Sequence, residues 1–270
     1  MAALDADALR AALVDHDGPY AALDVVPTTG STNADLMARA GEAADRTVLI
    51  AEEQTDGRGR RGREWVSPPE SGLYVSVLLR PDGVPTPKLG ALSLVAGVAL
   101  IRMARHMGVM AALKWPNDLL IGASMAKAAG ILAEVAATEP PAVVVGVGVN
   151  VGRLPREVPP GAGGLPATSF QQEGATADRA EVAVALLRCF AEVERSWRGA
   201  GGDLATSGLL AEYRANCATL GQRVRVELPQ DSARQGLAVE VDGDGQLVVD
   251  VDGTARTISA GDVVHLRALA

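Results

Sequence analysis

Cysteine, histidine and aromatic residues are scarce in this sequence of 270 residues. It holds two cysteines, Cys189 and Cys217, three histidines and 3% aromatic residues. Two cysteines allow no disulfide framework, and no histidine or cysteine has a neighbour at the spacing of metal ligands. The composition therefore gives little support to a structural zinc site or a Ser-His-Asp hydrolase, and we expect both thiols to be buried and reduced.

The sequence also lacks a visible targeting segment and a long apolar run. Its first residues contain no basic region followed by an apolar core, so no export signal is expected. The longest weakly polar run, from Leu89 to Met103, contains Ser93 and Arg102 and is too short to span a bilayer. With 48% hydrophobic and 21% charged residues, the composition is typical of a globular protein. We expect a cytoplasmic protein without membrane contact.

A strongly basic segment is present although the chain as a whole is acidic. Residues Gly57 to Arg63 read Gly-Arg-Gly-Arg-Arg-Gly-Arg, while the formal net charge is -8. Glycine lets a backbone approach a ligand closely, and arginine offers a planar fork to carboxylate or phosphate. The segment predicts a site for a specific anion; taken alone, it is also consistent with a solvated, flexible turn.

The spacing Gly57-x-Gly59-x-x-Gly62 matches a dinucleotide fingerprint, but that fingerprint requires a helix directly after the glycines. Pro68 and Pro69 follow within a few residues, and proline prevents a helix from continuing. The segment also lacks the Gly-Lys-Ser/Thr ending of a Walker loop. Both familiar nucleotide-binding loops are therefore disfavoured.

The hydrophobic pattern predicts a first domain in which strands alternate with helices. Helices are expected where apolar residues follow a helical period, and strands where runs alternate or are rich in β-branched residues. The expected helices are 5–15, 34–40 behind the cap Ser31-Thr32-Asn33, 88–106 in the core, 178–198 and 204–213. The expected strands are 47–51, 73–79 in a half-buried sheet, and 142–151 at the centre of the sheet.

The pattern changes after Leu220 to short alternating segments separated by turns such as Asp242-Gly243-Asp244-Gly245. The segments are 223–228, 236–241, 247–251, 255–258 and 263–266. Short strands so closely spaced predict a small β-barrel. We therefore expect two domains, residues 1–217 and 218–270.

Four polar clusters interrupt the apolar segments of the first domain. They are Ser31-Thr32-Asn33, Gln54 with the segment 57–63, Lys114-Trp115-Pro116-Asn117-Asp118 with Lys127, and Asn150. Each cluster alone has a structural explanation, as a helix cap, a solvated strand end, a turn or the start of a loop.

Taken in order and spacing, these clusters closely resemble biotin protein ligases. The resemblance runs from about residue 25 to the C-terminus. It extends to Trp65, Gly130-Ile131-Leu132-Ala133-Glu134, Gly146-Val147-Gly148-Val149-Asn150-Val151 and Ala167-Thr168-Ser169. It implies an α/β (α+β) fold, with a mixed sheet and flanking helices similar to class II aminoacyl-tRNA synthetases. A small C-terminal SH3-like β-barrel is expected to follow.

The resemblance also implies the activity. Such an enzyme activates biotin with ATP to biotinyl-5′-adenylate and transfers biotin to a specific lysine of a biotin carboxyl carrier protein or domain of an acyl-CoA or pyruvate carboxylase. Mg²⁺ is the expected metal, carried in on the phosphates, because such sites need only one or two carboxylates from the protein. No residue of this chain is assigned to the metal.

The resemblance assigns roles to the matching residues. Lys127 and Arg60 are expected to be catalytic, because cations must offset a repulsion of about 4 kcal/mol between two unit charges at about 4 Å. The residues expected to bind biotin are Ser31, Thr32, Asn33, Gln54, Gly57, Arg58, Gly59, Arg60 and Lys127. Those expected to face the nucleotide, its metal or the incoming lysine are Arg61, Arg63, Trp65, Asn117, Asp118, Asn150 and Ala167. The segment 57–63 is expected to act as a lid that retains the adenylate.

Three features set this chain apart within the family. The loop 122–126 before Lys127 is somewhat longer than in close relatives and lacks their usual basic neighbour, which bears on the placement of Lys127. Asp56 stands where the family usually has a small residue, and it either pairs with an arginine or weakens ligand binding. Only about 25 residues precede the match, too few for a DNA-binding helix-turn-helix, so we expect neither DNA binding nor transcriptional repression. A monomer or a weak homodimer is expected.

Two alternatives stay open at this point. A lipoate ligase shares the fold and the chemistry but is expected to lack the basic glycine segment. An RNA-binding module would combine a basic loop with a barrel, but such modules stack bases on aromatic side chains, and this chain has few.

Overall fold

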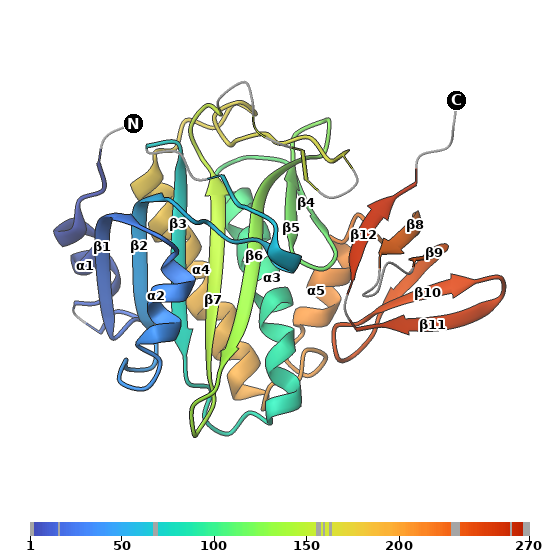
Figure 1. The fold of residues 1–270 in the computed structure, drawn as a ribbon, viewed down its shortest axis with the longest axis horizontal. Helices are drawn as coiled ribbons and strands as arrows, with labels where there is room; N and C mark the ends of the chain where they lie inside the picture. Colours follow the sequence, from blue (N-terminus) through green and yellow to red (C-terminus); the bar gives the residue numbers. More distant parts are fainter. Residues whose placement is uncertain are drawn as a thin grey trace.

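Seven strands form one mixed sheet in the computed structural model, and five more form an antiparallel sheet at the C-terminal end (Figure 1). The structure describes residues 3–15, 17–66, 70–154, 158, 160–161, 164–227, 233–259 and 261–266. The helical elements are α1 (Ala6–Leu13), α2 (Thr32–Ala38), η1 (Arg60–Gly62), η2 (Thr86–Ala91), α3 (Leu92–His106), α4 (Arg179–Gly199) and α5 (Leu209–Ala215). The strands of the large sheet are β1 (Ala22–Thr29), β2 (Thr47–Gln54), β3 (Gly72–Leu79), β4 (Ala111–Lys114), β5 (Asp118–Ile121), β6 (Ala126–Ala136) and β7 (Ala142–Asn150).

The order of strands in the large sheet is β1-β2-β3-β7-β6-β5-β4, so β7 lies at its centre, as predicted. The pair β1–β2 is parallel and the other pairs are antiparallel. Successive side chains of a strand point to opposite faces. Along β7 the odd-numbered valines, such as Val145 and Val147, therefore join the core on one face, while Gly146, Gly148 and Asn150 turn to the other.

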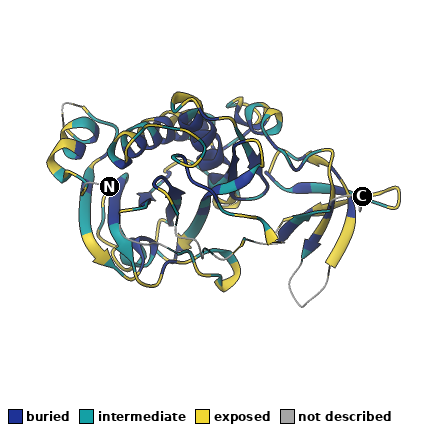
Figure 2. Cartoon of the chain, turned by 90° about the horizontal axis from the view of Figure 1, so that it is seen from above, coloured by how far each residue is buried: buried dark blue, intermediate teal, exposed yellow. Residues whose placement is uncertain are grey.

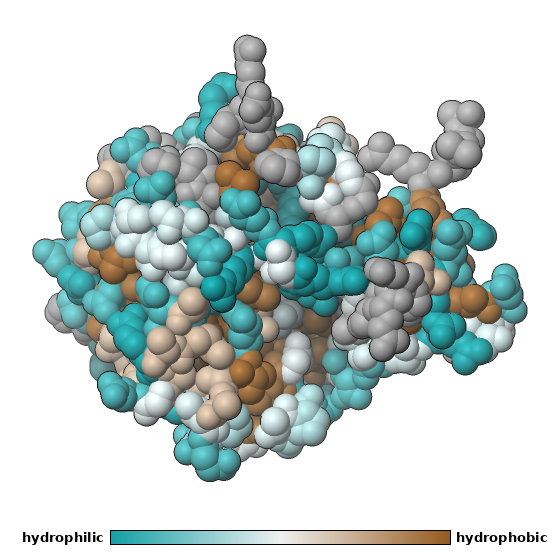
Figure 3. Space-filling model, viewed as in Figure 1, coloured by the Kyte–Doolittle hydropathy of each residue, from teal (hydrophilic) through white to brown (hydrophobic). Residues whose placement is uncertain are grey.

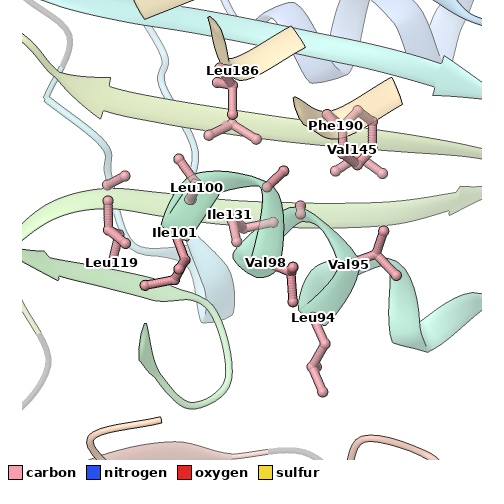
Figure 4. Packing of buried hydrophobic residues seen from close by; sticks show 14 of the residues in the cluster. Leu94, Val95, Val98, Leu100, Ile101, Leu119, Ile131, Val145, Leu186 and Phe190 are labelled. Carbon is pink, nitrogen blue, oxygen red and sulfur yellow. The ribbon is translucent and has the colours of Figure 1, made fainter. Parts of the chain in front are cut away.

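The core lies between the sheet and two helices that cover one of its faces. α3 has an almost wholly buried surface, and Figure 4 shows Val98 and Leu100 of this helix near Ile131 of β6, with Leu186 and Phe190 of α4 close by. The predicted core helix and the long helix 178–198 are both confirmed. A capping box formed by Asp178 and Glu181 begins α4, and its side-chain to backbone hydrogen bonds satisfy amide groups at the helix start.

The opposite face of the sheet is only partly covered. α2 packs over its lower part (Figure 1), where Leu36 and Ala40 meet Leu49 of β2, Leu78 of β3 and Val144 of β7. The rest of this face, which we call the open face, carries glycine and polar residues. The polar cluster Ser31-Thr32-Asn33, at the start of α2, therefore lies beside the small apolar cluster under this helix.

Three predictions need correction. The strand 73–79 is not half-buried, because every residue of β3 is buried between the helices of one face and the covered parts of the other. The helix predicted at 204–213 begins only at Leu209, since Gly208 has a φ of 76° and cannot continue a right-handed helix. The sequence did not indicate β1, which contains Pro27, nor the short strands β4 and β5.

One helical stretch among the described residues, 86–106, is long and apolar enough to cross a membrane by length and composition. The sequence had predicted that the apolar run from Leu89 to Met103 is too short to span a bilayer. The helical stretch that contains it is longer, so the predicted length was wrong. In the structure, 72% of that apolar window is buried inside the protein. A core helix passes the same test, and the packing in Figure 4 accounts for the composition of α3.

The C-terminal strands are β8 (Arg223–Glu227), β9 (Ala233–Val241), β10 (Leu247–Val251), β11 (Thr254–Ile258) and β12 (Asp262–His265). They pair in the order β11-β10-β9-β8-β12, which confirms the five predicted segments. Residue 228, at the end of the first segment, lies outside the described residues. Figure 2 shows this sheet as a separate lobe with many exposed positions. The predicted boundary between residues 217 and 218 stays a prediction.

A short chain of hydrogen bonds joins the two sheets at Trp115, which is buried beside β4. Its indole Nε1 donates to Gly245 O (3.0 Å), and its backbone N donates to Thr219 Oγ1 (3.0 Å). Thr219 Oγ1 also lies 3.1 Å from His265 Nε2. Because Trp115 uses Thr219 as an acceptor, the threonine proton can go to His265, which requires the neutral imidazole.

Burial makes this joint sensitive to acid. Burial lowers the pKa of His265 to about 4, and the positive charge of Lys114 lowers it further, whereas the ordinary value is 6.5. Between these values the unfolded chain binds a proton that the folded protein does not. The free energy of unfolding therefore falls as pH falls from about 6.5 to about 4.

We expect His265→Gln to reduce this slope by nearly one proton per molecule in urea titrations, and the exposed His106→Gln to leave it unchanged. Equal slopes for wild type and His265→Gln would refute the account.

Candidate functional site

A cavity of about 340 Å³ opens on the open face of the large sheet. Nearly all of the residues predicted to bind ligands line it; Gly57, Arg61 and Asp118 do not. The predicted residues on its wall are Ser31, Thr32, Asn33, Gln54, Arg58, Gly59, Arg60, Arg63, Trp65, Asn117, Lys127, Asn150 and Ala167. The fold thus brings together four clusters that are far apart in the sequence.

Glycines in β6 and β7 make the room for this cavity. Gly130 and Gly148 are paired neighbours in the sheet, and the indole of Trp65 lies against both. A Cβ atom on Gly148 would come within 2.5 Å of that indole, and one on Gly130 within 2.9 Å. A Cβ atom on Gly146 would lie 2.2 Å from Asn33 Oδ1. A side chain at any of these positions would displace Trp65 or Asn33.

One end of the cavity is lined by the uncharged polar residues Ser31, Thr32, Asn33 and Gln54. Ser31 is the N-cap residue of α2 but makes no side-chain cap hydrogen bond, so the explanation of this cluster as a simple helix cap is insufficient. Thr32 N donates to Gln54 Oε1 at 3.0 Å, and Thr32 Oγ1 lies 3.1 Å from the same oxygen. The fully buried Ser76 of β3 contacts both Thr32 (2.7 Å) and Asn33 (2.6 Å).

The other end of the cavity is cationic. Lys127 Nζ lies 2.7 Å from Asp118 Oδ1 and 5.3 Å from the centroid of the Trp65 ring, a distance that permits a cation–π interaction. Lys114 Nζ lies 3.7 Å from the other carboxylate oxygen of Asp118. Burial lowers the pKa of Lys114, and the charge of Asp118 acts in the opposite direction. One buried carboxylate thus holds two ammonium groups at this end.

The basic segment 57–63 is a short hairpin across the open face. Gly59 N donates to Arg63 O (2.6 Å), and Trp65 N donates to Gly57 O (2.8 Å). The chain reverses at Arg61 and Gly62, whose φ angles of 57° and 71° lie in the region that favours glycine. In Figure 3, hydrophilic residues gather in the middle of this face, where Figure 1 places η1. Gly57 lies at the base of this hairpin, where its carbonyl accepts the hydrogen bond from Trp65, and it does not line the cavity.

Three of the four arginines of the hairpin are paired with carboxylates. Arg58 Nη2 lies 2.9 Å from Asp56 Oδ2, so the expected pairing of Asp56 with an arginine is confirmed. Arg63 Nη2 lies 2.9 Å from Asp262 Oδ1 and Arg61 Nη1 lies 3.8 Å from Asp262 Oδ2. Asp262 is buried at the start of β12. The C-terminal sheet therefore holds the hairpin through Asp262.

Arg60 differs from these neighbours. Its Nη1 atom is buried and has no hydrogen-bond partner among the described residues, although the side chain lines the cavity. Burial lowers the pKa of Arg60, and the charges of Asp262 and Asp118 oppose this effect. A buried guanidinium donor without a partner is costly unless an acceptor arrives. Arg60 is thus prepared for an anion in the cavity.

The remaining predicted residues frame the cavity through backbone contacts. Asn117 Nδ2 donates to Ile131 O (2.8 Å) and Asn150 Nδ2 donates to Thr168 O (3.0 Å). Ala167 forms a bridge with Lys127, whose backbone N donates to Pro166 O (2.8 Å). Asn117 therefore ties the turn between β4 and β5 to β6, and Asn150 ties the end of β7 to Thr168, while both line the cavity.

Sequence reasoning missed several residues that shape the site. Ser76 and Glu134 support the polar end, and Asp262 supports the hairpin. A polar residue at an even position of β3 was the only available signal for Ser76. Nothing local indicated Asp262, which lies 199 residues from its partner Arg63.

No group of three or more His, Cys, Asp and Glu side chains in the described parts of the chain could hold a metal ion. Asp118 is already occupied by two lysines. A metal at this site would therefore rely on ligands brought by a bound molecule.

Comparison with known proteins agrees with this geometry. Residues 24–150 match the biotin/lipoate A/B protein ligase family, and residues 219–266 match the biotin protein ligase C-terminal domain. A biotin–acetyl-CoA-carboxylase ligase of Mycobacterium tuberculosis is 46% identical over 98% of this chain and 96% of its own. The bifunctional ligase/repressor of Bacillus subtilis is 31% identical over 89% of this chain and 72% of its own. The biotin protein ligase of Aquifex aeolicus in complex with biotin and ATP is 25% identical, with a TM-score of 0.74 over 92% of this chain and 100% of its own.

The contact of Asp262 with Arg61 and Arg63 generates a prediction about the hairpin. Asp262→Asn keeps the shape of the side chain but removes the charge that two guanidinium groups share. We expect the hairpin to open more often and trypsin to cleave after its arginines at least about fivefold faster, since local cleavage follows the population of open states. Asp250→Asn, in β10 of the same sheet, is the matched control and should be cleaved like wild type. Equal cleavage of all three proteins would show that Asp262 does not restrain the hairpin.

Proposed function

Since the chain belongs to the biotin protein ligase family, we propose that its cavity joins biotin to the adenylyl group of ATP and then gives the biotinyl group to a carrier lysine. The protein acted on is the biotin carboxyl carrier protein or domain of an acyl-CoA or pyruvate carboxylase. The reaction is that of an ATP-dependent, AMP-forming ligase. Comparison with the ligase of Mycobacterium tuberculosis, named for acetyl-CoA carboxylase, supports this assignment.

The observation that carries the proposal is the distribution of polarity along one cavity. At one end, Thr32, Asn33 and Gln54 offer uncharged hydrogen-bonding groups. At the other end, Lys127 and Arg60 offer positive charge. Biotin has a matching polarity, with a cyclic urea at one end, an apolar chain between and a carboxylate at the other.

The first step makes one bond and breaks another. A carboxylate oxygen of biotin attacks the α-phosphorus of ATP, and the bond between that phosphorus and the bridging oxygen of pyrophosphate breaks. Two anions must meet, so cations are needed between them. Lys127 and Arg60 line the same wall, and hydrogen bonds to charged groups contribute about 1.5 to 3 kcal/mol each. Trp65, Arg63, Asn117, Asn150 and Ala167 are proposed to surround the nucleotide.

The second step uses no nucleophile from this chain. The neutral amine of the carrier lysine attacks the acyl carbon of biotinyl-adenylate, the bond from that carbon to the phosphate oxygen breaks so that AMP leaves with the oxygen, and the nitrogen releases one proton to solvent. Asp118 is proposed to orient this amine. Its Oδ1 atom lies 2.7 Å from Nζ of Lys127, which lines the cavity. Cys189 and Cys217 are both buried, which agrees with a mechanism without a protein thiolate.

Three further parts belong to the proposal. Magnesium would arrive with the phosphates of ATP, since the described residues offer it no cage. The place of action is the cytoplasm, where carboxylases and ATP are available together. The chain is proposed to act without binding DNA.

Two other functions fit these contacts less well. Lipoate has a dithiolane ring without N–H or C=O groups, so it would leave the polar end of the cavity without partners, which costs about 1 to 3 kcal/mol for each buried group. An RNA-binding surface needs exposed cations along a groove. Here Arg61 and Arg63 pair with the buried Asp262, and Arg60 is mostly buried.

Replacing Lys127 tests the chemistry. Lys127→Ala removes the ammonium group between the two anions, and we expect biotin-dependent exchange of pyrophosphate into ATP to fall by at least about 100-fold. Lys88→Ala removes a half-buried lysine outside the cavity that pairs with Asp203 and Asp244, and it should leave exchange unchanged. Near-normal exchange in Lys127→Ala would remove this residue from the mechanism.

Calorimetric titration of the wild type with biotin, first alone and then with ATP and magnesium, tests the proposal as a whole.

Replacing Arg60 tests retention of the intermediate. We expect Arg60→Gly to keep part of the adenylation activity but to release biotinyl-adenylate, which then labels lysines of added albumin. The reason is that Arg60 alone in the hairpin offers the cavity a buried guanidinium donor without a partner among the described residues. Arg39→Gly, an exposed substitution at the end of α2, is the matched control. Albumin labelling by Arg60→Gly that is no higher than by the control would contradict a retaining role.

A further inference from the structure

Five side chains form a continuous row of close polar contacts at the polar end of the cavity. Glu134 Oε2 lies 2.7 Å from Asn33 Nδ2, and Asn33 Oδ1 lies 2.6 Å from Ser76 Oγ. Ser76 Oγ lies 2.7 Å from Thr32 Oγ1, which lies 3.1 Å from Gln54 Oε1. The residues come from α2 and from strands β2, β3 and β6. Each proton in such a row can be assigned once one end is fixed.

Glu134 fixes the first member of the row. The Asn33 atom near Glu134 also lies 3.1 Å from Leu132 O. A backbone carbonyl and a carboxylate oxygen both accept, so this atom must be the donating NH₂ group and the amide oxygen must face Ser76. The same oxygen lies close to the backbone of Gly146, since a Cβ atom added to this glycine would come within 2.2 Å of it. Asn33 therefore has one orientation.

Ser76 transmits this orientation to Thr32. A serine hydroxyl has one proton and cannot donate to two neighbours. The amide oxygen of Asn33 only accepts, and it makes the shorter contact, so it takes the proton of Ser76. Thr32 then has one proton and two oxygens that could accept it, Ser76 Oγ at 2.7 Å and Gln54 Oε1 at 3.1 Å. The shorter contact takes the proton, so Thr32 donates to Ser76. Thr32 thus spends its only proton inside the wall of the cavity.

The consequence is a pair of acceptors at the ligand-facing end of the row. Gln54 Oε1 accepts the backbone N–H of Thr32 at 3.0 Å. Thr32 Oγ1 has no proton left for Gln54, although the two oxygens lie 3.1 Å apart. Two oxygens at this distance repel each other unless a donor comes between them. Both residues line the cavity, so a ligand N–H can supply that donor.

We propose that Ser76 and Glu134 are positioning residues for ligand selection, which act through Asn33 to make Thr32 Oγ1 an acceptor for an N–H group of the ligand ring. The inference rests on the proposed function and deepens it, since it names the property of biotin that the site reads. A cyclic urea carries N–H groups, whereas a dithiolane or a cyclic carbonate of the same shape carries none. A site built to hydrogen-bond a substrate N–H rejects an analogue that lacks it far more strongly than an apolar pocket rejects a change of size.

The test measures ligand preference in two variants. Ser76→Ala removes the acceptor that takes the proton of Thr32. Glu134→Gln, at a half-buried position, removes the charged one of the two acceptors that orient the Asn33 amide and leaves Leu132 O alone to hold it, without a change of shape. The probes are biotin and a biotin analogue whose two urea N–H groups are replaced by oxygen, titrated by calorimetry. We expect each variant to bind biotin roughly 10- to 100-fold more weakly, while binding of the analogue changes less than about threefold. The KM for ATP and kcat at saturating biotin should stay close to wild type.

Two controls separate positioning from loss of structure. Val77→Ala alters the next residue of β3, which faces the core on the other side of the sheet, and Glu139→Gln alters an exposed carboxylate beyond β6. Both should keep the wild-type ratio of biotin to analogue affinity, even where Val77→Ala lowers the melting temperature.

The outcomes distinguish this inference from the proposed function. If the wild type does not bind biotin, the proposed function fails. If the wild type binds biotin and either folded variant keeps the full ratio, only the inference is overturned. An equal loss of the ratio in Val77→Ala would also overturn it, because general weakening of β3 would then suffice. The inference is supported only if Ser76→Ala and Glu134→Gln both lower the ratio of biotin to analogue affinity while the two control variants keep it.

Discussion

The site depends on bare backbone at the centre of the large sheet. Gly130 and Gly148 lie side by side in β6 and β7, and together they accept the flat face of Trp65. Because strand side chains alternate between faces, these glycines remove bulk from the open face without touching the valine core behind it. Trp65 then supports Lys127 at 5.3 Å from its ring centroid. A methyl group at either glycine would displace the indole and, with it, the lysine.

A second constraint is the distribution of charge. An acidic protein concentrates its cations around one cavity, and two buried carboxylates make this tolerable. Asp118 faces Lys114 and Lys127, and Asp262 faces Arg61 and Arg63. Unpaired charges in a poorly solvated site would repel each other by several kcal/mol. These ion pairs do not include Arg60. Its buried Nη1 atom has no hydrogen-bond partner among the described residues.

Sequence patterns predicted the parts of the site whose signal is local. The run of valines at 142–151 indicated a central strand, and β7 lies at the centre of the sheet. The basic glycine segment was identified, but not its hairpin shape, because a positive φ at Arg61 is rarely predicted for an arginine. Ser76 looked unremarkable in an apolar strand, since its meaning comes from residues more than 40 positions away. Asp262 lay in another domain of the sequence and became relevant only through folding.

The two ends of the cavity place different demands on the fold. At the polar end, each hydrogen bond must have a defined direction, so the row from Glu134 to Thr32 is built on strands and one helix start, which move little. At the cationic end, charge matters more than direction, and the groups must admit large anions and release products. These groups accordingly include a hairpin that is attached to the C-terminal sheet through Asp262. Through this attachment the small sheet contributes to the site. The hairpin is rich in glycine and flexible by itself, and Asp262 fixes the position of its arginines. Rigid selection at one end and a restrained, movable group at the other follow from which elements carry each set of residues.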